Sequence, residues 1–183
     1  MNDLPPAGFP TLNLNGGGGG DLIELTASPN FTASASLNID GQGGSDGIIM
    51  PAMSAGCPSL TINGGAGDDS VLFNGPIPFY SGANLNVDFQ NDDAAPGTDI
   101  MLFNTGALLQ LSGSGSATLR CSQNIYMSTG SGVTVTNGAL TAEANQQATA
   151  TTGNFNGITV DGAILGTVSA GTGNVVVKGR GGE

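Results

Sequence analysis

The sequence contains no histidine and no tryptophan, and only three of its 183 residues are basic: Arg120, Lys178 and Arg180. A uronate lyase in such a chain would lack the Lys or Arg that neutralises its substrate, and a sugar cleft would lack a tryptophan platform for stacking. Without histidine, neither Cys57 nor Cys121 has the base that a cysteine nucleophile needs. We therefore predict that the chain is not an enzyme.

Basic charge is scarce, whereas 14 residues are acidic, and 11 of these acids precede Arg120. That first part has formal charge −11, because it contains no base, and the remainder is neutral. Such a field repels phosphate backbones and anionic lipid, so we exclude nucleic acid and the membrane surface as partners.

Long apolar runs are also absent, so we expect no membrane insertion. The opening segment MNDLPPAGFP lacks the basic and apolar regions of a signal peptide. We expect either that export is handled elsewhere or that the sequence is a piece of a longer chain.

Glycine, by contrast, is abundant, with 32 residues, and it marks a repeat. Three segments superpose without a gap, LNLNGGGGGDLIEL (12–25), LNIDGQGGSDGIIM (37–50) and LTINGGAGDDSVLF (60–73), and a fourth, at 85–103, superposes with a five-residue insertion in its turn. Each copy predicts a strand, a glycine turn and a second strand, with alternate apolar residues facing one side. The predicted apolar columns are Leu12, Leu37, Leu60, Leu85; Leu14, Ile39, Ile62, Val87; Ile23, Ile48, Val71, Met101; and Leu25, Met50, Phe73, Phe103.

The repeat spacing indicates the fold. Equivalent aspartates, Asp21, Asp46, Asp69 and Asp99, follow one another after 25, 23 and 30 residues, which suits one coil of a parallel β-solenoid. We predict an all-β, right-handed parallel β-helix of about seven coils of roughly 25 residues, forming a rod roughly 35 Å long. Residues 1–183 form one domain, in which 11–103 hold the four Gly/Asp-loop repeats and 104–183 hold later coils without the Asp loop.

Polar residues outside the core should stack as well. One outward ladder is predicted from Asn13, Asn38, Thr61 and Asn86, and a second from Asn15, Asp40, Asn63 and Asp88. Further strands are predicted at 107–113, 117–122, 124–129, 132–137, 139–145, 157–162, 166–171 and 174–179. Residues 139–155 are also compatible with a short helix, although a strand followed by a longer protruding loop fits better.

Two resemblances follow from these residues. The glycine-aspartate turns resemble the calcium-binding repeats of secreted bacterial toxins, since Gly64-Gly65-Ala66-Gly67-Asp68-Asp69-Ser70-Val71-Leu72 fits their nonapeptide G-G-x-G-x-D-x-U-x. The segment from Ser122 to Gly182 is similar to giant bacterial surface adhesins of the filamentous-haemagglutinin-like kind. The resemblances imply an exported, repetitive stalk or adhesin segment at the extracellular or bacterial cell surface. The secretion module of those adhesins and the consecutive nonapeptides of those toxins are both absent here.

The toxin-repeat resemblance implies a calcium site. Its ligands would come from Asp21, Asp46, Asp68, Asp69 and Asp99 and from the turn of Gly64, Gly65 and Gly67, with the loops that end at Asp21, Asp46 and Asp69 as the main candidates. The carboxylates of this column repel one another, and bound Ca²⁺ would offset that repulsion. In the alternative, the glycines only permit positive φ in a tight turn, and the aspartates accept backbone N–H groups or face water.

Two other functions are open to this fold. A carbohydrate-active β-helix, such as a lyase, hydrolase or phage depolymerase, would need paired carboxylates, for which Asp68 with Asp69 or Asp92 with Asp93 are the candidates. An ice- or glycan-binding face would need an ordered threonine ladder, but the threonines of the segments 132–138, 146–153 and 166–174 do not share one column. We therefore expect a non-catalytic structural or adhesive segment that presents its loops to a glycan or other surface ligand.

The chain ends and the cysteines add two expectations. The last segment, NVVVKGRGGE, offers little to cover an exposed strand edge, so we predict end-to-end self-association into a filament or a native chain that continues past Glu183. Cys57 and Cys121 fall in different coils, so we predict that both are reduced and buried rather than joined in a disulfide.

Overall fold

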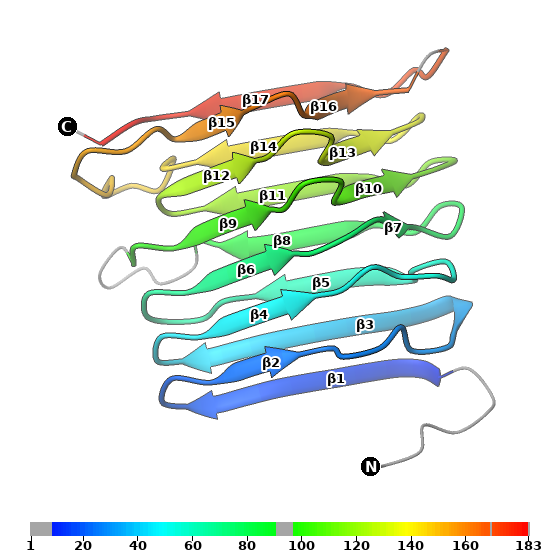
Figure 1. Ribbon diagram of the computed structural model, residues 1–183, viewed down its shortest axis with the longest axis horizontal. Helices are drawn as coiled ribbons and strands as arrows, with labels where there is room; N and C mark the ends of the chain where they lie inside the picture. The colour runs from blue at the N-terminus through cyan, green and yellow to red at the C-terminus, as the bar shows by residue number, and fades with distance from the viewer. Residues whose placement is uncertain (1–8, 91–96, 169, 183) are drawn as a thin grey trace.

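The computed structural model describes residues 9–90, 97–168 and 170–182, and within them the chain forms strands and turns and no helix. The strands fall into three sheets in which every pairing is parallel. The chain visits the sheets in turn and rises by one strand at each visit (Figure 1). The predicted parallel β-helix of about seven coils is therefore confirmed. No helix of the described residues has the length and apolarity needed to cross a bilayer.

The three sheets are numbered here in the order in which each coil meets them. Sheet 1 contains β1 (Phe9–Gly18), β3 (Phe31–Gly43), β5 (Ser59–Asn63), β8 (Leu85–Phe89), β11 (Ala117–Cys121), β14 (Leu140–Ala144) and β17 (Val175–Gly179). Sheet 2 contains β2 (Leu22–Glu24), β4 (Gly47–Met50), β6 (Ser70–Phe73), β9 (Ile100–Phe103), β12 (Asn124–Met127) and β15 (Ile158–Val160). Sheet 3 contains β7 (Ile77–Pro78), β10 (Leu108–Leu111), β13 (Gly132–Val135) and β16 (Ile164–Thr167). Each strand of sheet 1 opens a new coil, so coil 1 begins at β1 and coil 7 at β17.

The strand register is the one that the gapless repeats predict. The paired residues of sheet 1 are Leu12, Leu37, Leu60 and Leu85 in one column and Leu14, Ile39, Ile62 and Val87 in another. In sheet 2, Ile23, Ile48, Val71 and Met101 pair in the same way. Because side chains alternate along a strand, a slip by one residue would turn every one of these apolar side chains to solvent. The buried columns therefore fix the register.

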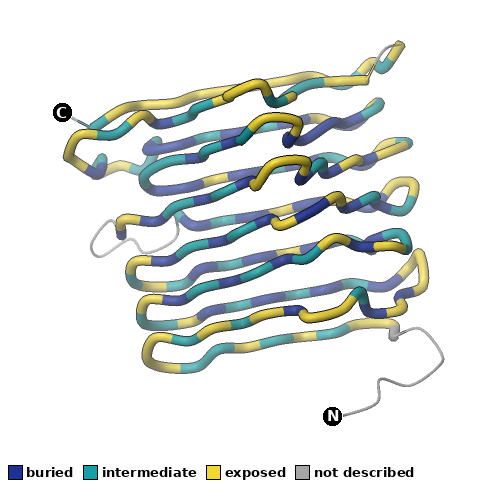
Figure 2. Tube along the Cα trace, in the orientation of Figure 1, coloured by how far each residue is buried: buried dark blue, intermediate teal, exposed yellow. Residues whose placement is uncertain are grey.

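The core lies inside the coils and is built from these columns. Figure 2 shows buried residues along each middle strand and exposed ones at the two ends of the stack. Phe73 and Phe103 lie in one column and stack with ring centroids 4.7 Å apart. Burial of each large side chain contributes about 1.5–3 kcal/mol. The core thus ties each coil to the next.

The third side of the solenoid differs from the prediction. Coil 3 adds β7, a strand that was not predicted, whereas β10 of coil 4 lies within the strand predicted at 107–113, and both belong to sheet 3. Residues 51–58 of coil 2 form no strand, and Pro51 and Pro58, which bracket them, lack the N–H that a ladder needs. The strand predicted at 166–171 lies instead at Ile164–Thr167, where Gly132 pairs with Ile164, and Ala170 has a φ of 67°.

The segment 139–155 forms a strand and a loop rather than a helix. β14 ends at Ala144, and Asn145 follows it with a φ of 56°, a left-handed value that asparagine tolerates. The loop folds back on the stack, because the Asn145 amide accepts the Thr151 N–H at 2.7 Å and donates to the Thr151 carbonyl at 3.0 Å. Thr151 in turn donates to the carbonyl of Gly97, two coils earlier, at 3.2 Å. This loop therefore packs over the corner between sheets 1 and 2.

Candidate functional site: an aspartate ladder and a charged column

The four equivalent aspartates form a hydrogen-bonded ladder at the corner between sheets 1 and 2. The backbone N–H of Asp21 donates to Oδ1 of Asp46 at 2.7 Å, that of Asp46 to Oδ1 of Asp69 at 2.8 Å, and that of Asp69 to Oδ1 of Asp99 at 2.7 Å. The carboxylates of Asp46, Asp69 and Asp99 therefore each accept the amide of the aspartate in the coil before. A hydrogen bond to an ionised acceptor is about twice as strong as one between neutral groups. This geometry agrees with the alternative in which the aspartates accept backbone N–H groups.

Most of the ladder is buried. Asp46, Asp69 and Asp99 are 3%, 2% and 1% exposed, whereas Asp21, in coil 1, is half-buried. Oδ2 of Asp21 and of Asp46 are enclosed and accept no hydrogen bond from the described residues. Adjacent unit charges about 4.8 Å apart repel by about 3.5 kcal/mol at an effective dielectric constant near 20. The N–H that Asp46, Asp69 and Asp99 each accept would offset only part of a repulsion of that size.

Two glycines show how closely the turns pack beside the ladder. A Cβ on Gly64 would lie 2.6 Å from Oδ2 of Asp69, so only glycine fits there. Gly65 has a φ of 100° and a Cβ there would meet the backbone of Gln42 in the coil before. Gln42 occupies the equivalent position in coil 2, pairs with Gly17, and has a φ of 76°. The turn thus requires a left-handed residue, and in coil 2 a glutamine adopts that conformation.

The ladder ends at a serine. The hydroxyl of Ser122 accepts the backbone N–H of Asp99 at 3.0 Å, and it lies 2.6 Å from Oδ2 of Asp99 and 2.7 Å from the Gly97 carbonyl. Ser122 is fully buried. A neutral hydroxyl therefore takes the place of a fifth carboxylate where the glycine-aspartate turns end.

Not every residue of the predicted calcium set joins the ladder. Asp68 lies on the outside of the turn, where its carboxylate accepts the Thr98 N–H at 2.8 Å, and this bond lowers the pKa of Asp68. Gly64, Gly65 and Gly67 shape the turn, with Gly64 donating its N–H to the Asp88 carbonyl at 3.2 Å. Asp92 and Asp93 lie outside the described residues.

The ladder offers few of the ligands that calcium takes. Ca²⁺ takes six to eight oxygen ligands. Among the described residues, no three acidic, histidine or cysteine side chains gather as a metal site requires. The Oδ1 atoms of Asp46, Asp69 and Asp99 already accept backbone amides. Calcium binding stays a prediction, and its test is described in the Discussion.

A second column, on the outer face of sheet 1, was predicted only in part. Its first four residues, Asn15, Asp40, Asn63 and Asp88, are paired as expected. The column then continues through Arg120, Glu143 and Lys178. Two of the three bases of the chain therefore stand in register with acids. Aligning the later strands with the four repeats would have found this column, but those strands lack the glycine-aspartate turn that anchors the alignment.

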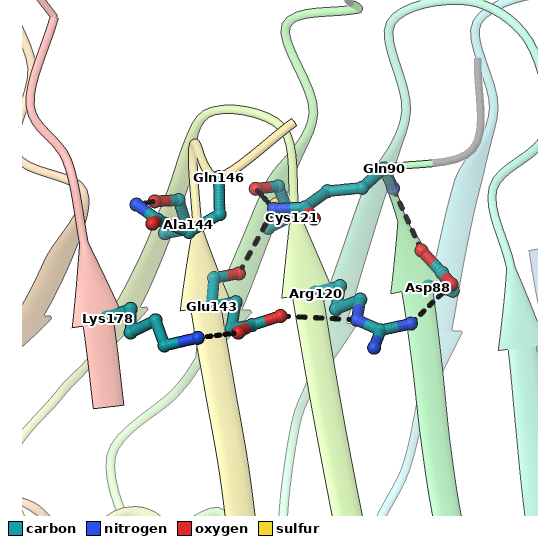
Figure 3. A network of polar contacts seen from close by, with 8 residues as sticks. All are labelled: Asp88, Gln90, Arg120, Cys121, Glu143, Ala144, Gln146 and Lys178. Carbon is teal, nitrogen blue, oxygen red and sulfur yellow. Dashed lines mark hydrogen bonds and ion pairs between the residues drawn. The ribbon is translucent and has the colours of Figure 1, made fainter. Parts of the chain in front are cut away.

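The upper half of this column is an alternating ion-pair chain. Arg120 contacts Asp88 at 3.6 Å and Glu143 at 3.3 Å, and Lys178 contacts Glu143 at 2.8 Å (Figure 3). The hydrogen bond from Lys178, followed by the contact with Arg120, lowers the pKa of Glu143. The chain of charges links four coils, from β8 to β17.

The lower acids of the same column shape turns. Asp40 accepts the N–H of Gln42 at 3.2 Å and Asp88 accepts that of Gln90 at 3.1 Å, so each closes the turn two residues ahead. The Gln90 side chain then reaches along the stack and donates to the Cys121 carbonyl at 2.8 Å (Figure 3). These acids therefore have local structural partners.

The remaining ladders show where the sequence prediction was incomplete. The outward column of Asn13, Asn38, Thr61 and Asn86 is confirmed and continues through Thr118 and Thr141. Three threonines thus share a column, which the sequence had not revealed. Thr134 and Thr167 pair with Gly166 and Val135, so those threonines form no ladder, as predicted. The outer face of sheet 2 carries an apolar column, Ile49, Leu72, Leu102 and Tyr126, each half-buried.

Both cysteines are buried free thiols, as predicted. Burial raises the pKa of Cys57 to about 12 and also raises the pKa of Cys121. The Cys121 thiol donates to the Asp99 carbonyl at 3.0 Å. Neither thiol has the thiolate character that a nucleophile or metal ligand needs.

Comparison with known proteins gives no relative for this chain: no protein-family model, no curated protein and no solved structure matches it significantly. The class of the molecule therefore rests on its own geometry, which is that of a parallel β-solenoid.

Proposed function

We propose that the chain is a non-catalytic structural or adhesive β-solenoid segment on the extracellular surface of a bacterium. The observation that carries this proposal is the unbroken register of sheet 1, in which seven strands from β1 to β17 stack in one parallel sheet. Each coil contacts its neighbours through core columns and outward ladders, so the fold holds the distance between its two ends. Such a stack keeps its two ends at a fixed distance and presents its loops to the surroundings.

The carboxylates support a structural role over a catalytic one. A glycoside hydrolase needs two carboxyl groups roughly 5–10 Å apart that both face the substrate. In this chain Asp69 is buried within the ladder whereas Asp68 faces solvent on the other side of the turn. Glu143 and Asp88 are held by Lys178 and Arg120. These four acids thus have assigned structural partners.

Surface labelling tests the location. Antibodies against the purified chain are expected to label intact cells of the producing bacterium, and protease added outside the cells should remove the label. An antibody against a cytoplasmic protein is the control. Labelling that appears only after lysis would contradict the proposal.

A depolymerase assay tests the absence of catalysis. The purified chain is incubated with uronate-containing and neutral polysaccharides, and new reducing ends are measured against a heat-denatured sample. We expect no release of product. Product release that Asp68→Asn abolishes would instead establish the carbohydrate-active alternative.

A further inference from the structure

The last coil exposes a strand edge whose side chains belong to core columns. Val175 and Val177 are 40% and 48% exposed, although their partners in β14, Leu140 and Ala142, are fully buried. Beside them, Val160 of β15 and Ile164 of β16 are 46% and 54% exposed. A hollow of about 620 Å³ opens between β15 and β17 and is lined in part by Ile158, Val160 and Val177. Figure 2 shows β17 exposed along its length.

The first coil exposes the matching edge. Leu12 and Leu14 of β1 stand in the same two columns of sheet 1 as Val175 and Val177, by the successive pairings from β1 to β17. Both leucines are only half-buried. No described residue pairs with the outer edge of β1, which is the terminal strand of its sheet. The two ends therefore present the same columns from opposite sides.

The described residues of the two ends differ in charge. Among the described residues, coil 1 contains Asp21 and Glu24 and no base, whereas the far end, from β15 to residue 182, contains Lys178 and Arg180 and one acid, Asp161. Asp21 begins the carboxylate ladder, so within the described chain no coil before it supplies an amide to its carboxylate. Arg180 is exposed, follows β17 directly, and makes no ion pair with a described residue. Asp21 lies between β1 and β2, and Arg180 directly follows β17, so both lie where the chain leaves sheet 1, at opposite ends of the stack.

We propose that the first coil of a second copy docks head-to-tail on the last coil. This inference rests on the proposed structural function and names its partner. β1 of the second copy continues sheet 1 beyond β17, so that its Leu12 and Leu14 cover Val175 and Val177. Arg180 of one copy then lies beside Asp21 of the next. Pairing of two last coils would bring Lys178 and Arg180 of both copies together, and like charges oppose that arrangement.

The contact joins two different surfaces and is therefore heterologous. A heterologous contact repeats, so assembly continues past the dimer, whereas an isologous contact stops at two chains. One chain forms a block about as tall along the stack as it is wide along its strands (Figure 1). Repeated docking would turn this block into a filament with one continuous sheet 1.

Sedimentation velocity over a concentration series tests the proposal. The chain is compared at about 0.01 M and about 1 M salt, where the Debye length is about 30 Å and about 3 Å. At low salt the mean mass should rise past two chains with concentration, and high salt should move this rise to higher concentration. Arg180→Gln should weaken the association about tenfold, which corresponds to about 1.4 kcal/mol.

Matched variants make the test specific. Gln110→Glu changes the net charge by the same amount at an exposed site in the middle of the stack, and it should leave the association unchanged. Asp21→Asn should weaken the association like Arg180→Gln, and the double variant should be no weaker than either single one, because the two residues form one contact.

Several outcomes would overturn the proposal. They are a single-chain mass at every concentration at low salt, assembly that stops at the dimer, and assembly that Arg180→Gln and Gln110→Glu alter equally. None of these outcomes bears on the surface labelling that tests the proposed function, so the two can fail separately.

Discussion

The carboxylate of Asp69 accepts the backbone N–H of Asp46 at 2.8 Å, and both residues are almost completely buried. This single contact joins two coils at the corner where the glycine turns pack. It also means that a charged side chain completes the backbone hydrogen bonding of the preceding coil.

Removal of that acceptor should destabilise the fold. Asp69→Ala leaves the buried N–H of Asp46 without its partner, and we expect a loss of about 1–3 kcal/mol in the free energy of unfolding. Asp69→Asn keeps an acceptor oxygen and removes one of the stacked charges, so it should cost less than half as much. Asp68→Ala, on the exposed side of the same turn, should cost less than about 1 kcal/mol. Urea denaturation measures all three, and equal losses for Asp69→Ala and Asp69→Asn would refute the ladder as the cause.

Calcium is tested by thermal unfolding in millimolar CaCl₂ and in chelator at low ionic strength. The calcium hypothesis predicts a rise of several degrees that Asp69→Ala abolishes. Because no three acids of the described residues gather at one point, we expect the two curves to coincide. Magnesium at the same concentration controls for general screening of the acidic surface. A rise specific to calcium would establish the site that the toxin-repeat resemblance implies.

Glu143 should make stability depend on pH. Lys178 and Arg120 favour its charged form, so its pKa in the folded chain lies below the ordinary value of 4.5. A carboxylate of this kind contributes stability that is fully present above its unfolded pKa and is lost as pH falls through its folded pKa. Both bases are about half exposed, so the contribution is at most about 1 kcal/mol.

The measurement compares unfolding free energies of the wild type and Glu143→Gln across pH 7 to 3. The two should differ at neutral pH and converge below about pH 4.5. Glu24→Gln, at an exposed acid of coil 1 without an ion pair to a described residue, should follow the wild type throughout. A difference that stays constant with pH would show that packing, and not charge, accounts for the effect of Glu143→Gln.

Gln42 offers a stabilising substitution. It adopts a φ of 76° where coils 1 and 3 have Gly17 and Gly65. A left-handed conformation costs a non-glycine residue about 1–2 kcal/mol, and the extra freedom of glycine in the unfolded chain returns about 0.4–1 kcal/mol of that. Gln42→Gly should therefore raise the unfolding free energy by about 0.5–1 kcal/mol, measured by denaturant titration. Gln42→Ala keeps the strained backbone and should give no gain; an equal gain from alanine would exclude relief of strain.

The parts of the fold that could be predicted are those that repeat. The columns from Leu12 to Leu85 were predictable because four segments align without ambiguity, and a shared apolar face admits one register. Sheet 3 was predictable only in part, because its later strands overlap the strands predicted at 107–113, 132–137 and 166–171, whereas β7 was not predicted. β7, Ile77–Pro78, follows Pro76 directly and is only two residues long, which is too short for an alternating pattern to be recognised.

The site was predictable in position and not in chemistry. The spacing of Asp21, Asp46, Asp69 and Asp99 placed them in one column, but whether each carboxylate meets a metal or an amide depends on the direction of its side chain. The charged column was missed because Arg120 and Lys178 acquire their acidic partners only through coil stacking, across 23 and 35 residues to Glu143. Residues so far apart in the sequence form no local pattern from which their contact could be predicted.

The direction of the aspartate ladder bears on how the chain is made. Each amide donates forward, to the carboxylate of the coil that follows it in sequence. In coils 1 to 3 the N–H of the aspartate therefore gains its acceptor only when the next coil has formed. Folding from the amino end would then proceed coil by coil, and a pause in synthesis would leave the last aspartate N–H without its acceptor until the next glycine turn has formed.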